Sequence, residues 1–392
     1  MASIAERFQI LLTEREQQHL YRRRPLSFSP QQTVMQINGV QTLNFSSNDY
    51  LGFANHPQIK QAVIEALQHN KISYGAGAAH LVTGHHLEHH ILEDEISDWL
   101  HTERALLFSA GYMANIAVQQ GLMQNGDVII ADKLNHASLI DGAQLSKADF
   151  KRYPHNDIEA LERRLQQAHK SGAQAMIVSD GVFSMDGDIA PLPAMQKLAQ
   201  KYSAWLFIDD AHGIGSLGTT GAGIFEHFGI KPDNNTLIVG TLGKAFGTSG
   251  AFVAASEIAI EALIQFARPY IYTTAMPQTN AVAIRQALKL VQTGQASRET
   301  LQQNIKHFKQ GAQHIGLNLH PSDTAIQPIL LGASETALAW SEALKQQGFW
   351  VTAIRPPTVP NNQARLRVTL SAAHSKNDIQ NLLQALEHLN HS

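Results

Sequence analysis

The sequence predicts an α/β protein with two domains, a large one with a mostly parallel sheet between helices and a smaller C-terminal α/β domain. From Ala105 onward, short apolar runs alternate with helical stretches, which is the element order of a parallel sheet. The runs are continuously apolar, as in strands buried on both faces. We expect residues 1–50 to form a helix and hairpin arm, 51–290 the large domain and 291–392 the small domain.

The N-terminal arm is expected to contain a helix and a hairpin. Apolar residues near helical spacing predict one amphipathic helix from Ile4 to Arg24. Asn38-Gly39 separates two short β-prone runs and is typical of a type I′ hairpin turn. Pro57 is favoured in the first turn of a helix, and we expect that helix to run to about His69.

The two domains are expected to contain alternating strands and helices. Large-domain strands are expected at residues 105–108, 127–131, 150–153, 175–178, 205–208, 237–239 and 251–254. Large-domain helices are expected at 112–123, 136–145, 157–170, 192–202 and 277–292. Small-domain strands are expected near 325–331, 350–353 and 364–370, with helices near 299–315, 335–347 and 377–389. Parallel sheets bind ligands beyond the carboxyl ends of their strands, which directs the search for a site.

The composition excludes several classes of function. A net charge of −3 over 392 residues gives no reason to expect binding to nucleic acid or to a membrane surface. The chain has no cysteine, so disulfides, a thiolate nucleophile and thiolate metal ligands are excluded. No apolar run is long enough for a membrane span, and the acidic start MASIAERFQILLTERE lacks the pattern of a secretion signal. We expect a cytoplasmic protein.

A lysine among small and apolar residues is the first candidate for chemistry. Lys244 follows the expected strand 237–239, in TLGKAFGTSG. Desolvation disfavours an ammonium ion, so we expect a lowered pKa and an amine that forms a Schiff base with a carbonyl cofactor. The alternative is a surface lysine on a glycine turn. A P-loop is excluded because Ile238 replaces its first glycine, and the GxGxxG at 213–218 lacks a following helix.

Polar residues follow other expected strands at the same edge. Asp209 and Asp210 close WLFID, where a carboxylate would hold a pyridine nitrogen protonated by about 4 kcal/mol. A helix N-cap and a metal-binding carboxylate pair are the alternatives. Residues 109–112, SAGY, join a strand to a helix N-terminus and form either a phosphate site or a plain glycine turn. His136 could stack on a flat ring and Ser184 could bond a cofactor, the alternatives being a satisfied histidine and a capping serine.

In this order, the motifs resemble those of the α-oxoamine synthases, which are fold-type I enzymes dependent on pyridoxal 5′-phosphate. The resemblance extends from about Leu20 to His374, and its markers are NFSSNDYLG, GVFSMDGD, DDAHG, TLGKAFGTSG and LSAAH. It implies the fold of those enzymes and pyridoxal 5′-phosphate as the cofactor.

The resemblance also implies roles for individual residues. Lys244 matches the Schiff-base lysine, Asp209 the partner of the pyridinium nitrogen, and His136 the histidine that stacks on the ring. The remaining matches to cofactor contacts are Gly111, Tyr112, Ser184, His212 and Thr241. The matches to substrate contacts are Arg22, Asn48, Arg355 and Thr358. A segment that reaches the neighbouring subunit's phosphate is matched by Tyr272, Thr273 and Thr274, which implies a homodimer with shared sites.

The segment AIRPPTVP, followed by ARLRVTL, is typical of a family member that acts in biotin biosynthesis. It implies condensation of L-alanine with a pimeloyl thioester of coenzyme A or acyl carrier protein, releasing CO2 and the thiol carrier. Both substrates carry carboxylates, which favour arginine. Arg23 and Arg24 are further candidates beside Arg22, and Arg365 and Arg367 are substitutes for Arg355.

Three other functions remain open at this point. The first is an α-oxoamine synthase that uses glycine or serine with another acyl thioester. The second is an aminotransferase or aldolase that depends on pyridoxal phosphate, which LSAAH and AIRPPTVP disfavour. The third is a non-catalytic binding protein of the same fold.

The segment GHHLEHH raises the question of a metal site. His85/His89 and His86/His90 are spaced i, i+4, as metal ligands on one helix face can be. No third ligand follows at a family spacing, and His89 has a counterpart in metal-free relatives. We therefore expect a partly exposed helix face and no metal.

Overall fold

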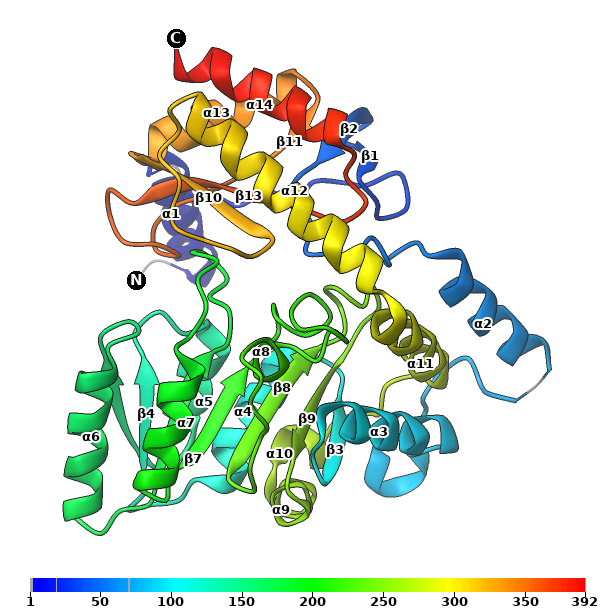
Figure 1. The fold of residues 1–392 in the computed structure, drawn as a ribbon, viewed down its shortest axis with the longest axis vertical. Helices are drawn as coiled ribbons and strands as arrows, with labels where there is room; N and C mark the ends of the chain where they lie inside the picture. Colours follow the sequence, from blue (N-terminus) through cyan, green and yellow to red (C-terminus); the bar gives the residue numbers. More distant parts are fainter. Residues whose placement is uncertain (1–2, 19, 70, 392) are drawn as a thin grey trace. The chain divides into compact units, whose positions relative to one another are not determined.

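The computed structural model describes residues 3–18, 20–69 and 71–391 of the chain. They form two compact units, whose elements are labelled in Figure 1. The small unit contains the residues up to Ser47, Met185–Gly187 and the residues from Gln302 onward. The large unit contains Asn48–Ser184 and Asp188–Leu301. Among the described helices, none combines the length and apolarity needed to cross a membrane.

The large unit is built on one sheet with the strand order β3-β9-β8-β7-β6-β4-β5. The strands are β3 (Arg104–Phe108), β4 (Val128–Asp132), β5 (Asp149–Tyr153), β6 (Ala175–Asp180), β7 (Trp205–Asp209), β8 (Thr236–Thr241) and β9 (Ala251–Ala255). β9 is antiparallel to both of its neighbours, and the other pairs are parallel. The predicted, mostly parallel sheet is therefore confirmed.

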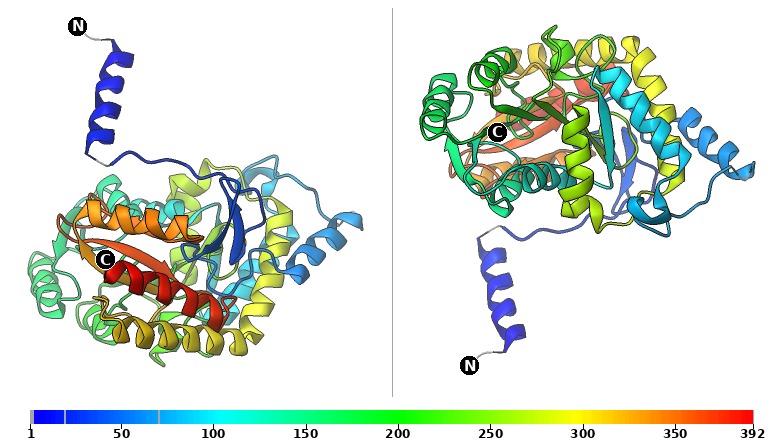
Figure 2. Two further views of the ribbon diagram at one scale, coloured as in Figure 1. Left: turned by 90° about the horizontal axis from the view of Figure 1, so that it is seen from above. Right: turned by 90° about the horizontal axis from the view of Figure 1, so that it is seen from below.

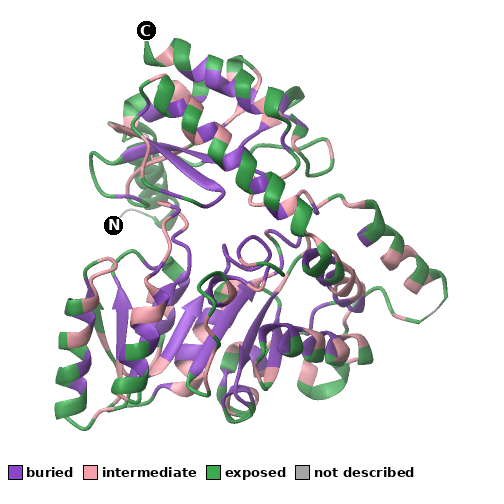
Figure 3. Cartoon of the chain, viewed as in Figure 1, coloured by how far each residue is buried: buried purple, intermediate pink, exposed green. Residues whose placement is uncertain are grey.

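Helices cover both faces of this sheet, and its strands other than the edge strand β5 are mostly buried (Figure 3). One face packs on α4 (Gly111–Leu122), α5 (Ala137–Leu145), α9 (Glu257–Phe266) and α10 (Arg268–Ile271). The other face packs on α6 (Ile158–Lys170), α7 (Leu192–Lys201) and α8 (Ile224–His227). The unit is completed by α2 (Pro57–Gln68), the π-helical turn η1 (His80–Gly84), α3 (Leu87–Leu100) and α11 (Gln278–Thr293). This packing explains the continuous apolar runs, because every side chain of such strands needs a partner layer.

The small unit contains two sheets and the helices that cover them. One sheet has the order β1-β2-β11, with β1 (Val34–Ile37), β2 (Val40–Asn44) and β11 (Phe349–Trp350). The other is antiparallel, with β10 (Ile326–Gly332), β13 (Ala364–Thr369) and β12 (Thr352–Ile354). The helices are α1 (Ile4–Gln17), α13 (Ser334–Gln346), α14 (Lys376–Asn390) and the later part of α12 (Gln295–His314). The predicted hairpin turn is confirmed, since Asn38 and Gly39 both have positive φ, 51° and 82°.

The expected helix from Ile4 to Arg24 is wrong in its C-terminal part. α1 ends at Gln17, where the N–H groups of Leu20 and Tyr21 both donate to Arg15 O, at 2.8 and 3.1 Å. None of its residues is buried, and α1 projects from the other elements (Figure 2). A helix without packing partners gains little from further turns, so the local hydrogen bonds end it.

Candidate functional site

Acidic side chains gather where β6 and β7 end in the large unit. Asp180 and Asp209 are register partners in the sheet, and Asp210 follows directly. Asp209 accepts hydrogen bonds from Asn115 Nδ2 at 2.6 Å and from Ala211 N at 3.1 Å. Burial raises the pKa of Asp210 to about 8, and burial next to Asp209 raises the pKa of Asp180 well above its usual range. Asp209 is thus held by two donors beside two acids that burial favours in the neutral form.

Lys244 stands beside this edge, three residues after β8 ends. Its Nζ lies 2.8 Å from His212 Nε2, and His212 Nδ1 lies 2.5 Å from Tyr50 Oη. Tyr50 is almost fully buried, and its hydroxyl also donates to Asn48 Oδ1 at 3.3 Å. An imidazole between a phenol and an amine can hold or pass a proton at either ring nitrogen.

His136 reaches the same edge from the start of α5. It is the N-cap of that helix, and its backbone N–H donates to Asp180 Oδ2 at 2.7 Å. Its Nδ1 lies 2.7 Å from Ser138 Oγ, and Asn115 Nδ2 donates to that hydroxyl at 2.8 Å. Burial lowers the pKa of His136, as does the charge of Lys244, while Asp209 opposes both. A neutral ring at pH 7 follows, held in place by its own helix start.

The N-terminus of α4 has no side-chain cap, because its N-cap residue is Ala110. Thr241, at the end of β8, lies directly against it. A Cβ added to Gly111 would sit 2.5 Å from Thr241 Cγ2, so only glycine allows this approach. Free N–H groups at a helix N-terminus form an anion site. The Thr241 hydroxyl itself donates to Ala211 O at 3.3 Å.

The chemical groups that these residues offer fit pyridoxal 5′-phosphate. The amine of Lys244 suits the aldehyde, and the buried carboxylate of Asp209 suits the ring nitrogen. The uncapped α4 N-terminus, with Gly111 against Thr241, suits the phosphate.

Comparison with known proteins agrees with this chemistry. A sequence profile of the family described as aminotransferase class I and II matches residues 40–386. The chain belongs to the aminotransferase class I and II family.

Individual members of the family are also similar to this chain. A Hydrogenovibrio crunogenus protein named 8-amino-7-oxononanoate synthase is 66% identical over 384 residues, covering 98% of this chain and 96% of that protein. A Stutzerimonas stutzeri protein of the same name is 52% identical over 377 residues, covering 96% and 94%.

Solved structures support the same grouping. A structure of SPT with PLP gives a TM-score of 0.93 at 30% identity, covering 100% of this chain and 99% of that one. A Sphingomonas wittichii structure at a TM-score of 0.92 carries the full name serine palmitoyltransferase. The crystal structure of 8-amino-7-oxononanoate synthase from Francisella tularensis gives 0.75 at 34% identity, covering 89% and 97%. The predicted fold class and the resemblance to the α-oxoamine synthases are therefore confirmed.

The large unit of this chain brings together many of the site residues predicted from the sequence. Near the strand ends of its sheet lie Gly111, His136, Asp209, His212, Thr241 and Lys244. Tyr112 is at the start of α4, and its hydroxyl donates to Asp141 Oδ2. Ser184 is half-buried at the end of a stretch of the large unit.

The candidate arginines lie in the small unit. A cavity of about 520 Å³ there is lined by Arg22, Arg355 and Thr358, with Arg15, Arg23 and Lys345. Arg355 donates to Tyr21 O at 3.3 Å, and burial next to Arg22 lowers its pKa. The cavity therefore has an unusual density of positive charge. Arg23 pairs with Glu16 at 3.7 Å, and both side chains are exposed.

Arg365 was expected as a substitute for Arg355, and the structure contradicts this. Its side chain is only 3% exposed and forms an ion pair with Asp186. It also donates to Met185 O at 3.3 Å. Arg367 is buried too, and donates to Thr369 Oγ1 at 3.0 Å. Both alternate along β13 as expected, but at Arg365 the partly buried carboxylate of Asp186 already pairs with the charge that a substrate would need.

The segment 272–274 lies apart from the hydrogen bonds around Lys244. Tyr272 is 71% exposed, and Thr274 forms an isolated bridge with Ala79. Ala275 N donates to Ala78 O at 3.0 Å, so this segment runs beside the loop that precedes η1.

Sequence reasoning missed three residues of the site: Tyr50, Asn115 and Asp180. Tyr50 lies in the NFSSNDYLG motif, from which only Asn48 was selected. Asn115 is one turn into α4, on the buried face that also carries Ala114 and Val118. Asp180 ends an apolar strand as Asp209 does, and that shared position was the available signal.

Proposed function

We propose that this protein is a pyridoxal-phosphate-dependent 8-amino-7-oxononanoate synthase of biotin biosynthesis. It condenses L-alanine with a pimeloyl thioester, releasing CO2 and the free thiol carrier. The observation that carries the proposal is the 66% identity over 98% of the chain to a protein of that name. The Lys244 site supports it independently, because an amine, an imidazole and a buried carboxylate meet at one sheet edge.

We propose the residues that would hold pyridoxal phosphate from this site and from the family resemblance. Lys244 would bind its aldehyde carbon, and Asp209 would accept the N–H of its ring nitrogen. Gly111, Tyr112 and Thr241 would contact the cofactor and its phosphate, with Thr273 and Thr274 of the neighbouring subunit at the phosphate. His136 stacks on the ring, and Ser184 and His212 lie near its hydroxyl. When bound, the cofactor supplies an electron sink for the amino acid's Cα electrons.

The chain's own residues then manage protons and charges. Lys244 Nζ takes the Cα proton of alanine, and His212 Nε2, 2.8 Å away, shares that proton. Burial lowers the pKa of His136, and its Nδ1 accepts the backbone N–H of Ser138 at 3.3 Å, so the neutral ring carries its proton on Nε2. That N–H can donate to the substrate carboxylate or to the thioester oxygen. Asn115 keeps the carboxylate of Asp209 in place through its 2.6 Å bond.

Substrate recognition is assigned to Asn48, Arg22, Arg355 and Thr358. A guanidinium binds a carboxylate in two places at once, which suits alanine and the distal carboxylate of the pimeloyl chain. The density of arginines at the small-unit cavity supports this assignment. The thiol carrier is coenzyme A or acyl carrier protein, and we propose a cytoplasmic homodimer.

The test is a product assay with purified protein. Incubation with L-alanine and pimeloyl-CoA is expected to give 8-amino-7-oxononanoate by mass spectrometry, with equal free thiol. Lys244→Ala is expected to abolish product, and Asp209→Asn to reduce it by orders of magnitude. A solved structure named serine palmitoyltransferase has a TM-score of 0.93, which makes L-serine with a palmitoyl thioester the competing pair. Faster turnover of that pair would overturn the proposal.

A further inference from the structure

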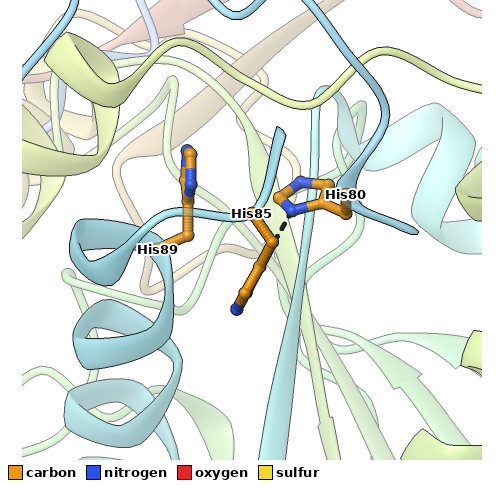
Figure 4. Close-up of side chains that lie close together, drawn as sticks. All are labelled: His80, His85 and His89. Atoms are coloured by element: carbon orange, nitrogen blue, oxygen red, sulfur yellow. Dashed lines mark hydrogen bonds between the residues drawn. The ribbon is translucent and has the colours of Figure 1, made fainter. Parts of the chain in front are cut away.

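A group of histidines that the proposed reaction does not use lies at the start of α3. They are His80 in η1, His85 and His86 before the helix, and His89 and His90 in its first turn. Figure 4 shows His80, His85 and His89 side by side. Two sets among the described residues have ligand atoms within 4.8 Å of one another: His80, His85 and His89, and His85, His90 and Glu93.

His89 is already satisfied at both ring nitrogens. Its Nε2 lies 2.9 Å from Met276 O, so it carries the proton and donates to that carbonyl. Its Nδ1 accepts the backbone N–H of His86 at 3.1 Å. A metal at His89 would break one of these bonds inside a fully buried side chain. His89 is therefore a structural residue. The set of His80, His85 and His89 thus lacks a third free lone pair for a metal ion.

His85 has one nitrogen in a hydrogen bond and one that faces a carboxylate. Its Nδ1 lies 3.0 Å from His80 Nδ1, the dashed line in Figure 4. Its Nε2 lies 3.9 Å from Glu93 Oε2. When His85 Nδ1 donates to His80, the lone pair of His85 Nε2 is left free on the side of Glu93. His80 stacks on Tyr270 with centroids 5.4 Å apart, which fixes its own ring.

Glu93 is a buried carboxylate with one oxygen to spare. The residue is 8% exposed, and Oε1 accepts the backbone N–H of Leu107 at 3.0 Å. Within the described part of the chain, Oε2 has no hydrogen-bond donor, and His85 at 3.9 Å is its ion-pair neighbour. A cation at Oε2 would give this buried oxygen the polar partner that burial requires.

His90 completes the set from the same helix face. It precedes Glu93 by three residues on α3, which places the two side chains side by side. Its ring is perpendicular to that of His85, with centroids 5.8 Å apart. The side chain of His90 is 64% exposed, so solvent has access to the site. This set differs from the i, i+4 pairs noted in the sequence, where no metal was expected, because His85 lies before the helix begins.

We propose that His85 Nε2, His90 and Glu93 Oε2 bind a divalent transition-metal ion of the Zn²⁺ class. Two imidazoles and one carboxylate form a known Zn²⁺ ligand set that leaves a fourth position for water. His80 is a positioning residue, which fixes the ring and tautomer of His85. The ion ties the segment before α3 to the helix and gives Glu93 Oε2 a cationic partner. This site is independent of the proposed function.

Zn²⁺ binding by tag-free holoenzyme tests the site. After chelator treatment and dialysis against buffered Zn²⁺, elemental analysis is expected to find one ion per chain. His90→Gln changes an exposed side chain, so the protein folds, and it is expected to weaken binding at least 10-fold. His80→Phe keeps the ring stacking and is expected to weaken binding about 10-fold. The matched control is His227→Gln, an exposed histidine on α8, with unchanged binding.

A second readout distinguishes a built site from surface chelation. Zn²⁺ is expected to raise the Tm of the native protein and the control, but not that of His90→Gln or Glu93→Gln. Binding that needs millimolar Zn²⁺, or equal binding by His90→Gln and the native protein, would overturn the proposal. Loss of binding in His89→Gln with retention in His90→Gln would assign the ion to the other set.

Discussion

Tyr50 Oη, His212 and Lys244 Nζ form one hydrogen-bonded row with spacings of 2.5 and 2.8 Å. Without the phenol, the imidazole is no longer fixed at Nδ1, and its orientation toward Lys244 loosens. We expect Tyr50→Phe to fold normally and to lower kcat about 5-fold, since a single such bond contributes about 1 kcal/mol. Steady-state kinetics will measure this, with the exposed Tyr74→Phe as control. An unchanged kcat in Tyr50→Phe would remove the row from the mechanism.

His155 binds two acids at once, with Nδ1 3.1 Å from Asp132 Oδ1 and Nε2 2.7 Å from Asp188 Oδ2. Burial alone would lower the pKa of His155, but the two carboxylates outweigh it and raise the pKa to about 10. The unfolded value is near 6.5. The stabilisation is therefore complete below about pH 6.5 and is lost as the pH rises toward 10.

Urea unfolding at several pH values will measure this contribution. Between pH 7 and 10, we expect the native protein to lose about 2 kcal/mol more unfolding free energy than His155→Gln. This value allows for solvent screening, because the His155 side chain is partly exposed. The groups shared by both proteins cancel in this comparison. Parallel pH profiles for the two proteins would show that His155 is not charged in the folded state.

Single residues at strand ends could be predicted from the sequence, but their partners could not. Asp209 and Lys244 each follow an apolar run, and a parallel sheet brings such positions together. Tyr50 and Asn115 reach the same site from a loop and from a helix face. Their contacts span 162 and 94 positions of the chain, and no local pattern encodes that distance.

At the scale of elements, continuous apolar runs predicted the strands of the sheet, because burial on both faces leaves a local record in the sequence. The direction of β9 left no such record, since a strand reads the same parallel or antiparallel. The π-turn η1 was not predicted either.

The GxGxxG of 213–218 has a packing role: a Cβ on Gly213 would sit 2.0 Å from Asp210 Oδ1.

The approach of α4 to β8 gives a prediction at this scale. In Gly111→Ala the new methyl group would meet Thr241 Cγ2 at 2.5 Å and push the helix N-terminus away from the strand. We expect at least a 10-fold weaker affinity for pyridoxal phosphate, because helix N–H groups bind phosphate only in close approach. Absorbance titration of cofactor-free protein will measure the Kd.

The matched control for this prediction removes the obstructing atom. Thr241→Ser keeps the hydroxyl and lacks Cγ2, so Gly111→Ala with Thr241→Ser is expected to regain most of the lost affinity. If the double variant binds as weakly as Gly111→Ala alone, the defect comes from the helix itself rather than from its contact with β8.

At the scale of the whole molecule, the chain carries features that a single copy leaves unused. α1 has no buried residue, although Ile4, Phe8 and Leu11 are all large and apolar. Tyr272 is 71% exposed on a segment that the family resemblance assigns to a neighbouring subunit's phosphate. Large exposed apolar side chains on one helix are typical of an interface, which supports the homodimer expected from the sequence.

Shared sites make a prediction that independent sites do not. Lys244→Ala and a Thr273→Val, Thr274→Val double variant are each expected to have little activity as homodimers. In a mixed dimer, one site would combine both defects, and the other would have the native lysine from one subunit and native threonines from its partner. Exchange of subunits at equal amounts is therefore expected to restore about a quarter of the native activity.

The same mixture has a different outcome if each site is built from one chain. Every lysine-deficient site then stays inactive, every threonine-deficient site keeps its own defect, and mixing restores nothing. Light scattering will establish that dimers form, and a mixture of Lys244→Ala with Asp209→Asn is the matched control. Those two residues belong to one unit of one chain, so that mixture is expected to stay inactive under either arrangement. Restored activity only in the first mixture would place Thr273 and Thr274 across the dimer from Lys244.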